Sequence, residues 1–221
     1  MKKALIVFIK EPVPGRVKTR LQSHLAQGKI VELYKLFVNA IISRCVRLKG
    51  IDKFAGCFPA KDNDFFRGLA RTYKIRCFNQ QGNDLGEKLV NAFKSFFKKG
   101  YTEVVIIGSD SPTIPADYIK KAFSELKKKD FVLGPCCDGG LYLVGAKKKI
   151  RPAIFRNIPW DTTRILNRTL NKMLERLDSL DVKFSMLPFW YDIDTVEDLK
   201  LFKNHIKYLK MKEFNKWHTN N

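Results

Sequence analysis

Residues 104–112 read Val-Val-Ile-Ile-Gly-Ser-Asp-Ser-Pro, and this stretch decides the fold. Four consecutive β-branched residues are typical of a strand buried on both faces, as in the middle of a parallel sheet. The polar residues that follow would lie at the carboxyl end of that strand, where open α/β sheets bind ligands. The carboxylate of Asp110 is therefore either a ligand for a divalent metal beside a substrate phosphate or a cap, for the helix that begins near Pro115 or for an intervening turn.

Strand and helix patterns alternate on both sides of this stretch. Apolar runs predict further strands at 4–9, 53–58, 75–78, 131–133, 141–144 and 182–187. Apolar residues at helical spacing predict helices over 30–48, 64–73, 85–96, 119–126, 165–177 and 195–206. Such alternation calls for parallel strands joined by right-handed crossovers. We expect one α/β domain over residues 1–221, with a mostly parallel central sheet flanked by helices and a basic tail from about residue 207.

The net charge of +20 raises the question of an anionic partner. A basic surface attracts the phosphates of any nucleic acid. Here the excess is spread over several lysine runs, and no RNA-binding aromatic motif, zinc finger or helix-turn-helix accompanies it. We expect a small anionic substrate to be the partner and do not expect nucleic acid, although a basic nucleic-acid-binding module without catalysis remains an alternative.

The sequence gives no sign of export or of membrane insertion. Its apolar start, residues 4–9, is too short for a signal peptide and is better explained as the first strand. No stretch approaches the length of a membrane span. The five cysteines lack C-x-x-C spacing, so neither a zinc site nor a disulfide framework is indicated. We expect a cytoplasmic protein.

A cationic loop, residues 10–20, follows the first predicted strand directly. It carries Lys10, Arg16, Lys18 and Arg20 around Gly15. Such a loop can bring backbone N–H groups and cations up to a pyrophosphate. It matches neither the Walker loop nor the Rossmann glycine pattern. The alternative is a solvated basic turn.

Four acids form the second candidate group: Asp110, Asp138, Asp192 and Asp194. Asp192 and Asp194 stand two apart, so in an extended segment they face the same way and could share a metal with Asp110. The alternatives are that Asp138 belongs to an Asp-Gly turn and that Asp194 caps the last helix. A third, weaker group is the polar loop 81–88, whose helix N-terminus could receive a phosphate or a nucleobase. Taken alone, this loop is better explained as a plain helix-entry turn.

Taken in order, these motifs resemble a known family. The matching segments are 8–12, 15–21, 85–86, 108–112, 133–135, 138–145 and 192–199. They are similar to the bacterial glycosyltransferase-like family of nucleotide-diphospho-sugar transferases, some of which are associated with arsenosugar biosynthesis. A more distant resemblance is to the phospholactate and molybdenum-cofactor guanylyltransferases. Leu141 departs from the pattern, because an aromatic residue is typical after Asp-Gly-Gly.

The resemblance implies a GT-A-type fold that uses a nucleotide-activated donor, a small-molecule acceptor and a divalent metal, Mg²⁺ or Mn²⁺. It implies donor contacts from Lys10, Arg16, Lys18, Thr19, Arg20, Gly86 and Ser109. Metal ligands would be Asp110, Asp192 and Asp194, with Gly139 and Gly140 on the acceptor side. The candidate catalytic residues are Asp110 and Asp138, and Asp138 would orient or deprotonate the acceptor hydroxyl. We expect glycosyl transfer from a nucleotide-diphospho-sugar. The alternative is nucleotidyl transfer to a phosphorylated metabolite, with release of pyrophosphate.

Overall fold

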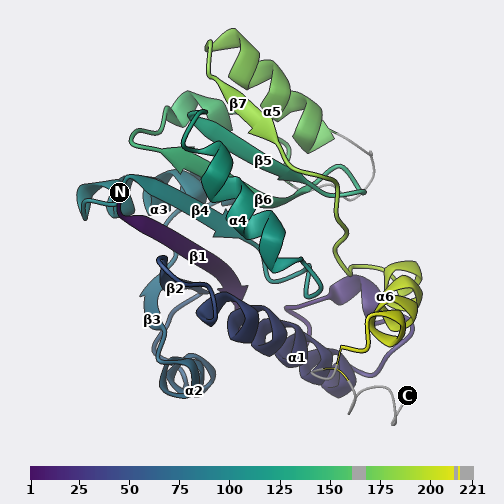
Figure 1. Ribbon diagram of the computed structural model, residues 1–221. Helices are drawn as coiled ribbons and strands as arrows, with labels where there is room; N and C mark the ends of the chain where they lie inside the picture. Colours follow the sequence, from purple (N-terminus) through teal and green to yellow (C-terminus); the bar gives the residue numbers. More distant parts are fainter. Residues whose placement is uncertain (161–167, 212–213, 215–221) are drawn as a thin grey trace.

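One seven-stranded sheet organises the computed structural model, which describes residues 1–160, 168–211 and 214 (Figure 1). In spatial order its strands are β3 (Arg76–Asn79), β2 (Asp52–Phe58), β1 (Lys3–Lys10), β4 (Glu103–Ile107), β6 (Leu141–Lys147), β5 (Phe131–Pro135) and β7 (Phe184–Met186). All seven coincide with strands predicted from the apolar runs. The expected α/β class with a mostly parallel sheet is confirmed.

β6 is the strand that departs from the parallel arrangement. It pairs antiparallel with both β4 and β5, whereas the other neighbouring strands pair in parallel. The reason is local: only residues 136–140 separate β5 from β6, and so short a connection can join antiparallel strands but not parallel ones. β6 therefore inserts between β4 and β5, and the simple alternation of strand and helix fails at this point.

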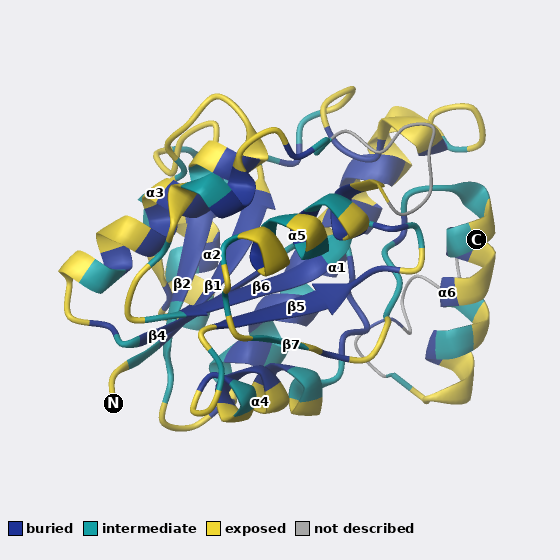
Figure 2. Ribbon diagram, turned by 90° about the horizontal axis from the view of Figure 1, so that it is seen from above, coloured by how far each residue is buried: buried dark blue, intermediate teal, exposed yellow. Residues whose placement is uncertain are grey.

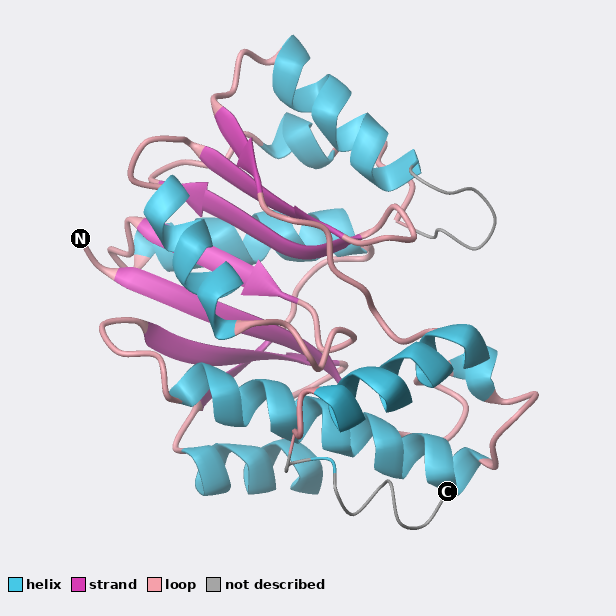
Figure 3. Cartoon of the chain, turned by 45° about the vertical axis from the view of Figure 1, so that its right-hand side comes forward, coloured by secondary structure: helices cyan, strands magenta, loops and turns pink. Residues whose placement is uncertain are grey.

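Helices cover both faces of the sheet (Figure 3). One hydrophobic core joins the sheet to α1 (Gln27–Val46), α2 (Asp64–Tyr73), α4 (Ala116–Glu125) and α6 (Val196–Tyr208). A second core joins the opposite face to α3 (Leu85–Lys98), α5 (Arg168–Ser179) and the short 3-10 helix η2 (Pro152–Phe155). The first three residues of the predicted helix 165–177 lie outside the described residues, as does most of the basic tail.

The central strands are buried on both faces, as the sequence predicted. All five residues of β4 are buried, and the strands appear dark blue in Figure 2. Side chains alternate between the two cores: Val105 and Ile107 contribute to one, and Val104 and Ile106 to the other. β4 is also hydrogen-bonded on both edges, to β1 and to β6. The residues after β4 are therefore held in place by a rigid strand.

α6 lies beside α1 rather than directly over the sheet (Figure 1). The rings of Phe37 and Phe202 meet edge to face, with 5.3 Å between their centroids and 77° between their planes. This contact places the residues that precede α6 at the carboxyl end of β4. Among the residues described, no helix has the length and apolar character needed to cross a membrane.

Candidate active site

A cavity of about 790 Å³ opens at the carboxyl ends of β1 and β4. Its walls come from the 10–20 loop, the residues after β4, the β5–β6 hairpin, the start of α3 and segment 192–194. This is the edge at which open α/β sheets bind ligands. The predicted site residues that line it are Lys10, Arg16, Lys18, Thr19, Arg20, Ser109, Asp110, Asp138, Gly140, Asp192 and Asp194.

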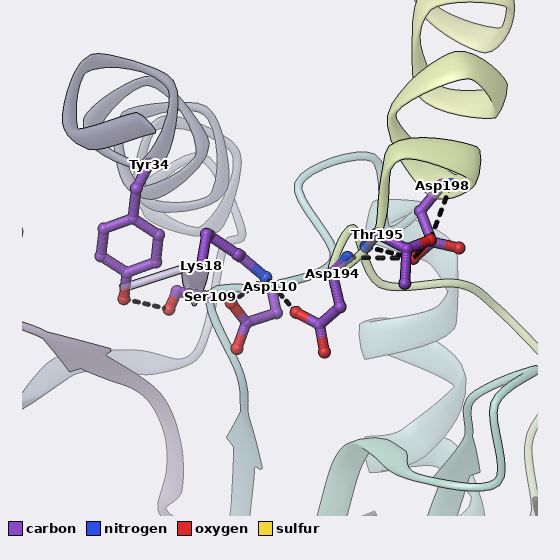
Figure 4. A network of polar contacts seen from close by, with 7 residues as sticks. All are labelled: Lys18, Tyr34, Ser109, Asp110, Asp194, Thr195 and Asp198. Atoms are coloured by element: carbon purple, nitrogen blue, oxygen red, sulfur yellow. Dashed lines mark hydrogen bonds and ion pairs between the residues drawn. The ribbon is translucent and has the colours of Figure 1, made fainter. Parts of the chain in front are cut away.

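Lys18 joins the cationic loop to two of the acids (Figure 4). Its ammonium donates to Asp194 Oδ1 at 2.8 Å and forms an ion pair with Asp110 Oδ1. The Lys18 side chain is only 2% exposed, against 48% for Asp110 and 37% for Asp194. Burial alone would lower the pKa of Lys18, but the charges of Asp110 and Asp194 outweigh it and raise that pKa above its ordinary value. Lys18 is therefore a buried, charged ammonium shared by two carboxylates.

The loop that carries Lys18 is anchored by apolar side chains on either side of it. Val17 and Leu21 are buried in the core formed with α1, and Leu21 ends the short 3-10 helix η1 (Thr19–Leu21). Between them Lys18 adopts a left-handed backbone conformation, with φ of 47°. Few residues other than glycine adopt this conformation. The packing of its neighbours thus turns Lys18 inward while Arg16 and Arg20 remain exposed.

Asp110 is positioned by backbone hydrogen bonds on both sides of it. Gly108 N–H donates to the carbonyl of Tyr142 at 3.2 Å, which ties the end of β4 to β6. Ile193 N–H donates to the carbonyl of Asp110 at 3.0 Å. Because Ile193 directly precedes Asp194, this bond fixes the backbone of one acid beside the backbone of the other.

Asp194 does not cap the last helix. The cap of α6 is Thr195, whose hydroxyl accepts from Asp198 N–H at 3.3 Å, while the Asp198 carboxylate accepts from Thr195 N–H at 2.8 Å. This reciprocal pair is a capping box. Asp198 also accepts from Asp194 N–H at 3.0 Å. The Asp194 carboxylate is thereby left to face Lys18, which together with Arg20 and Lys10 overcomes the effect of burial and lowers its pKa.

Asp138 and Asp192 form a neighbouring cluster with Cys136. One ligand-type atom from each of the three side chains lies within 4.8 Å of the other two. Burial, and then the charges of Asp138 and Asp194, raise the pKa of Asp192 to about 7. Asp138 Oδ1 accepts from Gly140 N–H at 2.8 Å, so the predicted Asp-Gly turn is present. That turn occupies one Asp138 oxygen, and the side chain still lines the cavity.

Ser109 takes part in a buried network that the sequence did not reveal. The Tyr34 hydroxyl lies 2.7 Å from Ser109 Oγ (Figure 4). The same hydroxyl accepts from Lys10 N–H at 3.1 Å. Tyr34 occupies a core position of α1, and its helical spacing predicts packing only. Its hydroxyl links the end of β1 to the exit of β4. Ser109 is thus engaged by Tyr34, and its contact with a donor stays a prediction.

Two of the predicted glycines do not line the cavity. A Cβ atom at Gly86 would lie 2.7 Å from Trp160 Nε1 and 3.1 Å from the carbonyl oxygen of Phe155, so glycine is needed for this packing. Trp160 itself lines the cavity and was not predicted. Gly139 has φ of 88°, and its carbonyl accepts from Leu170 N–H at 3.1 Å, which ties the hairpin to α5. Both glycines support residues of the wall.

The carboxylates of Asp110 and Asp194 are suited to bind one divalent metal ion together. Each gives one oxygen to Lys18, and Figure 4 shows the second oxygens pointing the same way, away from the ammonium. Carboxylate oxygens are the donors that Mg²⁺ and Mn²⁺ prefer, and Mg²⁺ keeps further positions for water and phosphate. The chemistry of these residues therefore matches the expected metal, and the participation of Asp192 stays a prediction.

Comparison with known proteins identifies a family and structures of similar fold. The family model described as "Uncharacterized protein conserved in bacteria (DUF2064)" matches residues 41–162. A crystal structure from Desulfovibrio desulfuricans, of a protein assigned as a nucleotide-diphospho-sugar transferase, superposes with a TM-score of 0.84 at 32% sequence identity. The match covers 94% of this chain and 89% of that one. A search of curated proteins gave no match.

More distant structures share the fold. A cytidylyltransferase from Leptospira borgpetersenii has a TM-score of 0.54 at 14% identity, covering 94% of this chain and 88% of its own. The 4-diphosphocytidyl-2C-methyl-D-erythritol synthase from Anaerococcus prevotii has a TM-score of 0.60 at 12% identity, with coverage of 93% and 96%. At such identities the likeness establishes the architecture and nothing about substrates.

Proposed function

The chain belongs to the DUF2064 family and is a nucleotide-dependent transferase, and we propose that it moves a glycosyl group from a nucleotide-diphospho-sugar to a small acceptor. One observation carries the proposal: the cations that follow β1 and the acids that follow β4 and precede α6 line a single cavity. The name of the Desulfovibrio protein, which is 32% identical, supports this choice of donor.

The donor pyrophosphate would lie against the cationic loop. Arg16 and Arg20 are exposed at the cavity and offer planar guanidinium groups suited to phosphate oxygens. Lys10 is also exposed there. Lys18 is buried between Asp110 and Asp194. Its main role would be to hold these two carboxylates in position, and contact with the phosphates would be secondary. The cations would stabilise the charge that develops on the departing nucleoside diphosphate.

Asp110 and Asp194 would hold the divalent metal through their second oxygens. When bound, the metal would supply positive charge to the phosphates of the donor and of the leaving group. These two residues come from different parts of the chain and are aligned by the hydrogen bond between Ile193 and Asp110. Loss of that alignment would separate the two ligands.

Asp138 would contact the hydroxyl group of the acceptor. One of its oxygens is fixed by Gly140 N–H, which leaves the other to accept the proton of an acceptor hydroxyl. The hydroxyl oxygen would bond to the anomeric carbon as the bond from that carbon to the phosphate oxygen breaks. The proton would pass to Asp138 and the nucleoside diphosphate would leave.

Donor turnover tests the proposal. The protein should slowly hydrolyse one nucleotide-diphospho-sugar of a donor panel in the presence of Mg²⁺ or Mn²⁺, releasing nucleoside diphosphate and free sugar. Asp138→Asn should retain donor binding and lose this turnover. Release of pyrophosphate from a nucleoside triphosphate would instead establish nucleotidyl transfer, because sugar transfer cannot yield it.

A further inference from the structure

The amino-terminal edge of the sheet, opposite the candidate active site, holds most of the net charge. We define this basic edge as residues 1–3, 47–53, 74–76, 98–103, 127–130, 147–151 and 178–183. It contains 17 of the 42 Lys and Arg residues but only five of the 22 Asp and Glu residues. A little under a sixth of the chain thus carries twelve of its twenty net positive charges. The sequence alone made these lysine runs look dispersed.

Topology brings these seven segments together. Six strands begin at this edge and the antiparallel β6 ends there. Backbone hydrogen bonds connect the turns in a row. Asp130 N–H donates to the carbonyl of Lys183 at 2.8 Å, and Lys147 N–H donates to that of Asp130 at 2.9 Å. Lys148 N–H donates to the carbonyl of Thr102 at 2.8 Å, and Thr102 N–H donates to that of Lys2 at 2.9 Å.

Three of the five acids of the basic edge, Asp130, Asp178 and Asp181, are exposed but form no ion pair with its cations in the part of the chain that the structure describes. Glu103 is completely buried, so its carboxylate does not face the solvent. Asp52 accepts from the Tyr101 hydroxyl at 2.6 Å and pairs with Arg76 at 3.6 Å. Among the described residues, no other Lys or Arg of the basic edge forms an ion pair. Most of its ammonium groups therefore face solvent without a carboxylate partner.

The chemistry of the basic edge favours lipid phosphates over nucleic acid. It contains 14 lysines and three arginines, and its single aromatic residue, Tyr101, is buried. Recognition of single-stranded nucleic acid uses exposed aromatic rings and arginine to stack on bases. Clustered lysines are mobile point charges, each worth about 1 kcal/mol beside an anionic leaflet. We propose that the basic edge docks the protein on the surface of an anionic lipid bilayer.

The proposed orientation has a consequence for the cavity. The candidate active site opens at the carboxyl ends of β1 and β4, whereas the basic edge lies at their amino ends. A docked molecule would therefore present its cavity to the solution and not to the lipid. Donor and acceptor would both arrive from the aqueous side, so docking and donor binding are separable properties.

Vesicle sedimentation with two matched triple variants tests this inference. One variant, Lys128→Gln with Lys148→Gln and Lys149→Gln, removes three exposed charges from the basic edge. The control, Lys35→Gln with Lys94→Gln and Lys121→Gln, removes three exposed charges elsewhere. At about 100 mM salt the wild type and the control should bind vesicles containing about 30% phosphatidylglycerol. The edge variant should bind about tenfold or more weakly, and none should bind pure phosphatidylcholine.

Several outcomes would overturn the inference. Equal losses in the two triple variants would mean that only the total charge matters. Wild-type binding to neutral vesicles, or no binding to anionic ones, would exclude electrostatic docking. Tighter binding of a single-stranded oligonucleotide of about 20 nucleotides than of anionic vesicles, lost in the edge variant alone, would assign the surface to nucleic acid. Both variants should keep the wild-type unfolding free energy to within about 0.5 kcal/mol, because the replaced lysines are exposed.

Discussion

The ammonium of Lys18 lies 2.8 Å from a carboxylate oxygen of Asp194, although 176 positions separate the two residues in the sequence. Asp110 binds the same ammonium. One buried cation therefore joins the loop after β1, the exit of β4 and the turn before α6. The proposed transferase needs these three segments at one cavity, since it requires cations for the donor phosphates and acids for the metal.

Asp110→Asn should abolish detectable Mn²⁺ binding while the protein still folds. The change removes one of two metal ligands and one of two partners of the buried Lys18. Because Asp110 is 48% exposed, solvent screening limits the cost to about 1–2 kcal/mol of unfolding free energy. Electron paramagnetic resonance of free Mn²⁺ and urea denaturation measure the two quantities. Normal Mn²⁺ affinity in the variant would remove Asp110 from the metal site.

Lys18→Gln should strengthen Mn²⁺ binding in the absence of nucleotide by about tenfold, corresponding to roughly 1.4 kcal/mol. In the wild type the ammonium already neutralises Asp110 and Asp194, so it competes with the metal for their charge. The metal-free variant should be less stable than the wild type, because two carboxylates then face each other without a cation. Lys35→Gln, an exposed change on α1, serves as the control. Weaker Mn²⁺ binding to the Lys18 variant would show that Lys18 supports the metal rather than competing with it.

Lys18 separates what the sequence could predict about the site from what it could not. The run of cations after the first strand predicted a phosphate-binding loop, and its position beside the acids was expected because the carboxyl ends of parallel strands meet at one edge of the sheet. The burial of Lys18 was not expected, because it depends on the packing of Val17 and Leu21 into a core formed with α1 and on contacts with Asp110 and Asp194, which lie far along the chain. Likewise, the pattern at 194–198 left open which residue caps α6, and only the structure assigns the cap to Thr195.

Gly86→Ala should destabilise the protein by about 1–3 kcal/mol. The added methyl group would lie 2.7 Å from Trp160 Nε1 and 3.1 Å from a backbone carbonyl, so the indole must move out of the cavity wall. Gly28→Ala is the matched control, since no atom lies within 4 Å of its new methyl group and alanine favours the helix. Thermal denaturation of both variants checks the contrast. A Gly86 variant as stable as the Gly28 variant would contradict the packing described here.

His205 predicts a pH dependence of stability. Partial burial in α6, beside the Tyr191 hydroxyl, lowers its pKa below the ordinary value of 6.5. The unfolded chain therefore binds a proton more readily than the folded one, and stability is lost as the pH falls below about 6.5. Urea denaturation at about pH 7.5 and 5.5 should show a larger loss for the wild type than for His205→Gln. Equal losses would mean that His205 titrates alike in both states.

The antiparallel β6 illustrates a second limit of the sequence. All seven strands were predictable because each is a short apolar run, but their order was not. Asp138-Gly139-Gly140 favours a tight turn, and a tight turn joins antiparallel strands. The strand after this turn was nevertheless expected to be parallel, because strands and helices alternate elsewhere in the chain. The hydrogen bond between the Tyr34 hydroxyl and Ser109 could not be predicted for a different reason. A tyrosine at a core position of a helix predicts packing, but the sequence does not indicate which polar group its hydroxyl contacts.

Calorimetric titration of the wild type with a panel of nucleotide-diphospho-sugars, with and without Mn²⁺, tests the central claim most directly. The claim is that cations and acids from distant parts of the chain form one site for a metal-bound donor pyrophosphate. We predict that one donor binds and that its affinity rises at least about tenfold when Mn²⁺ is present. Equal affinity with and without the metal, or no binding across the whole panel, would contradict the account.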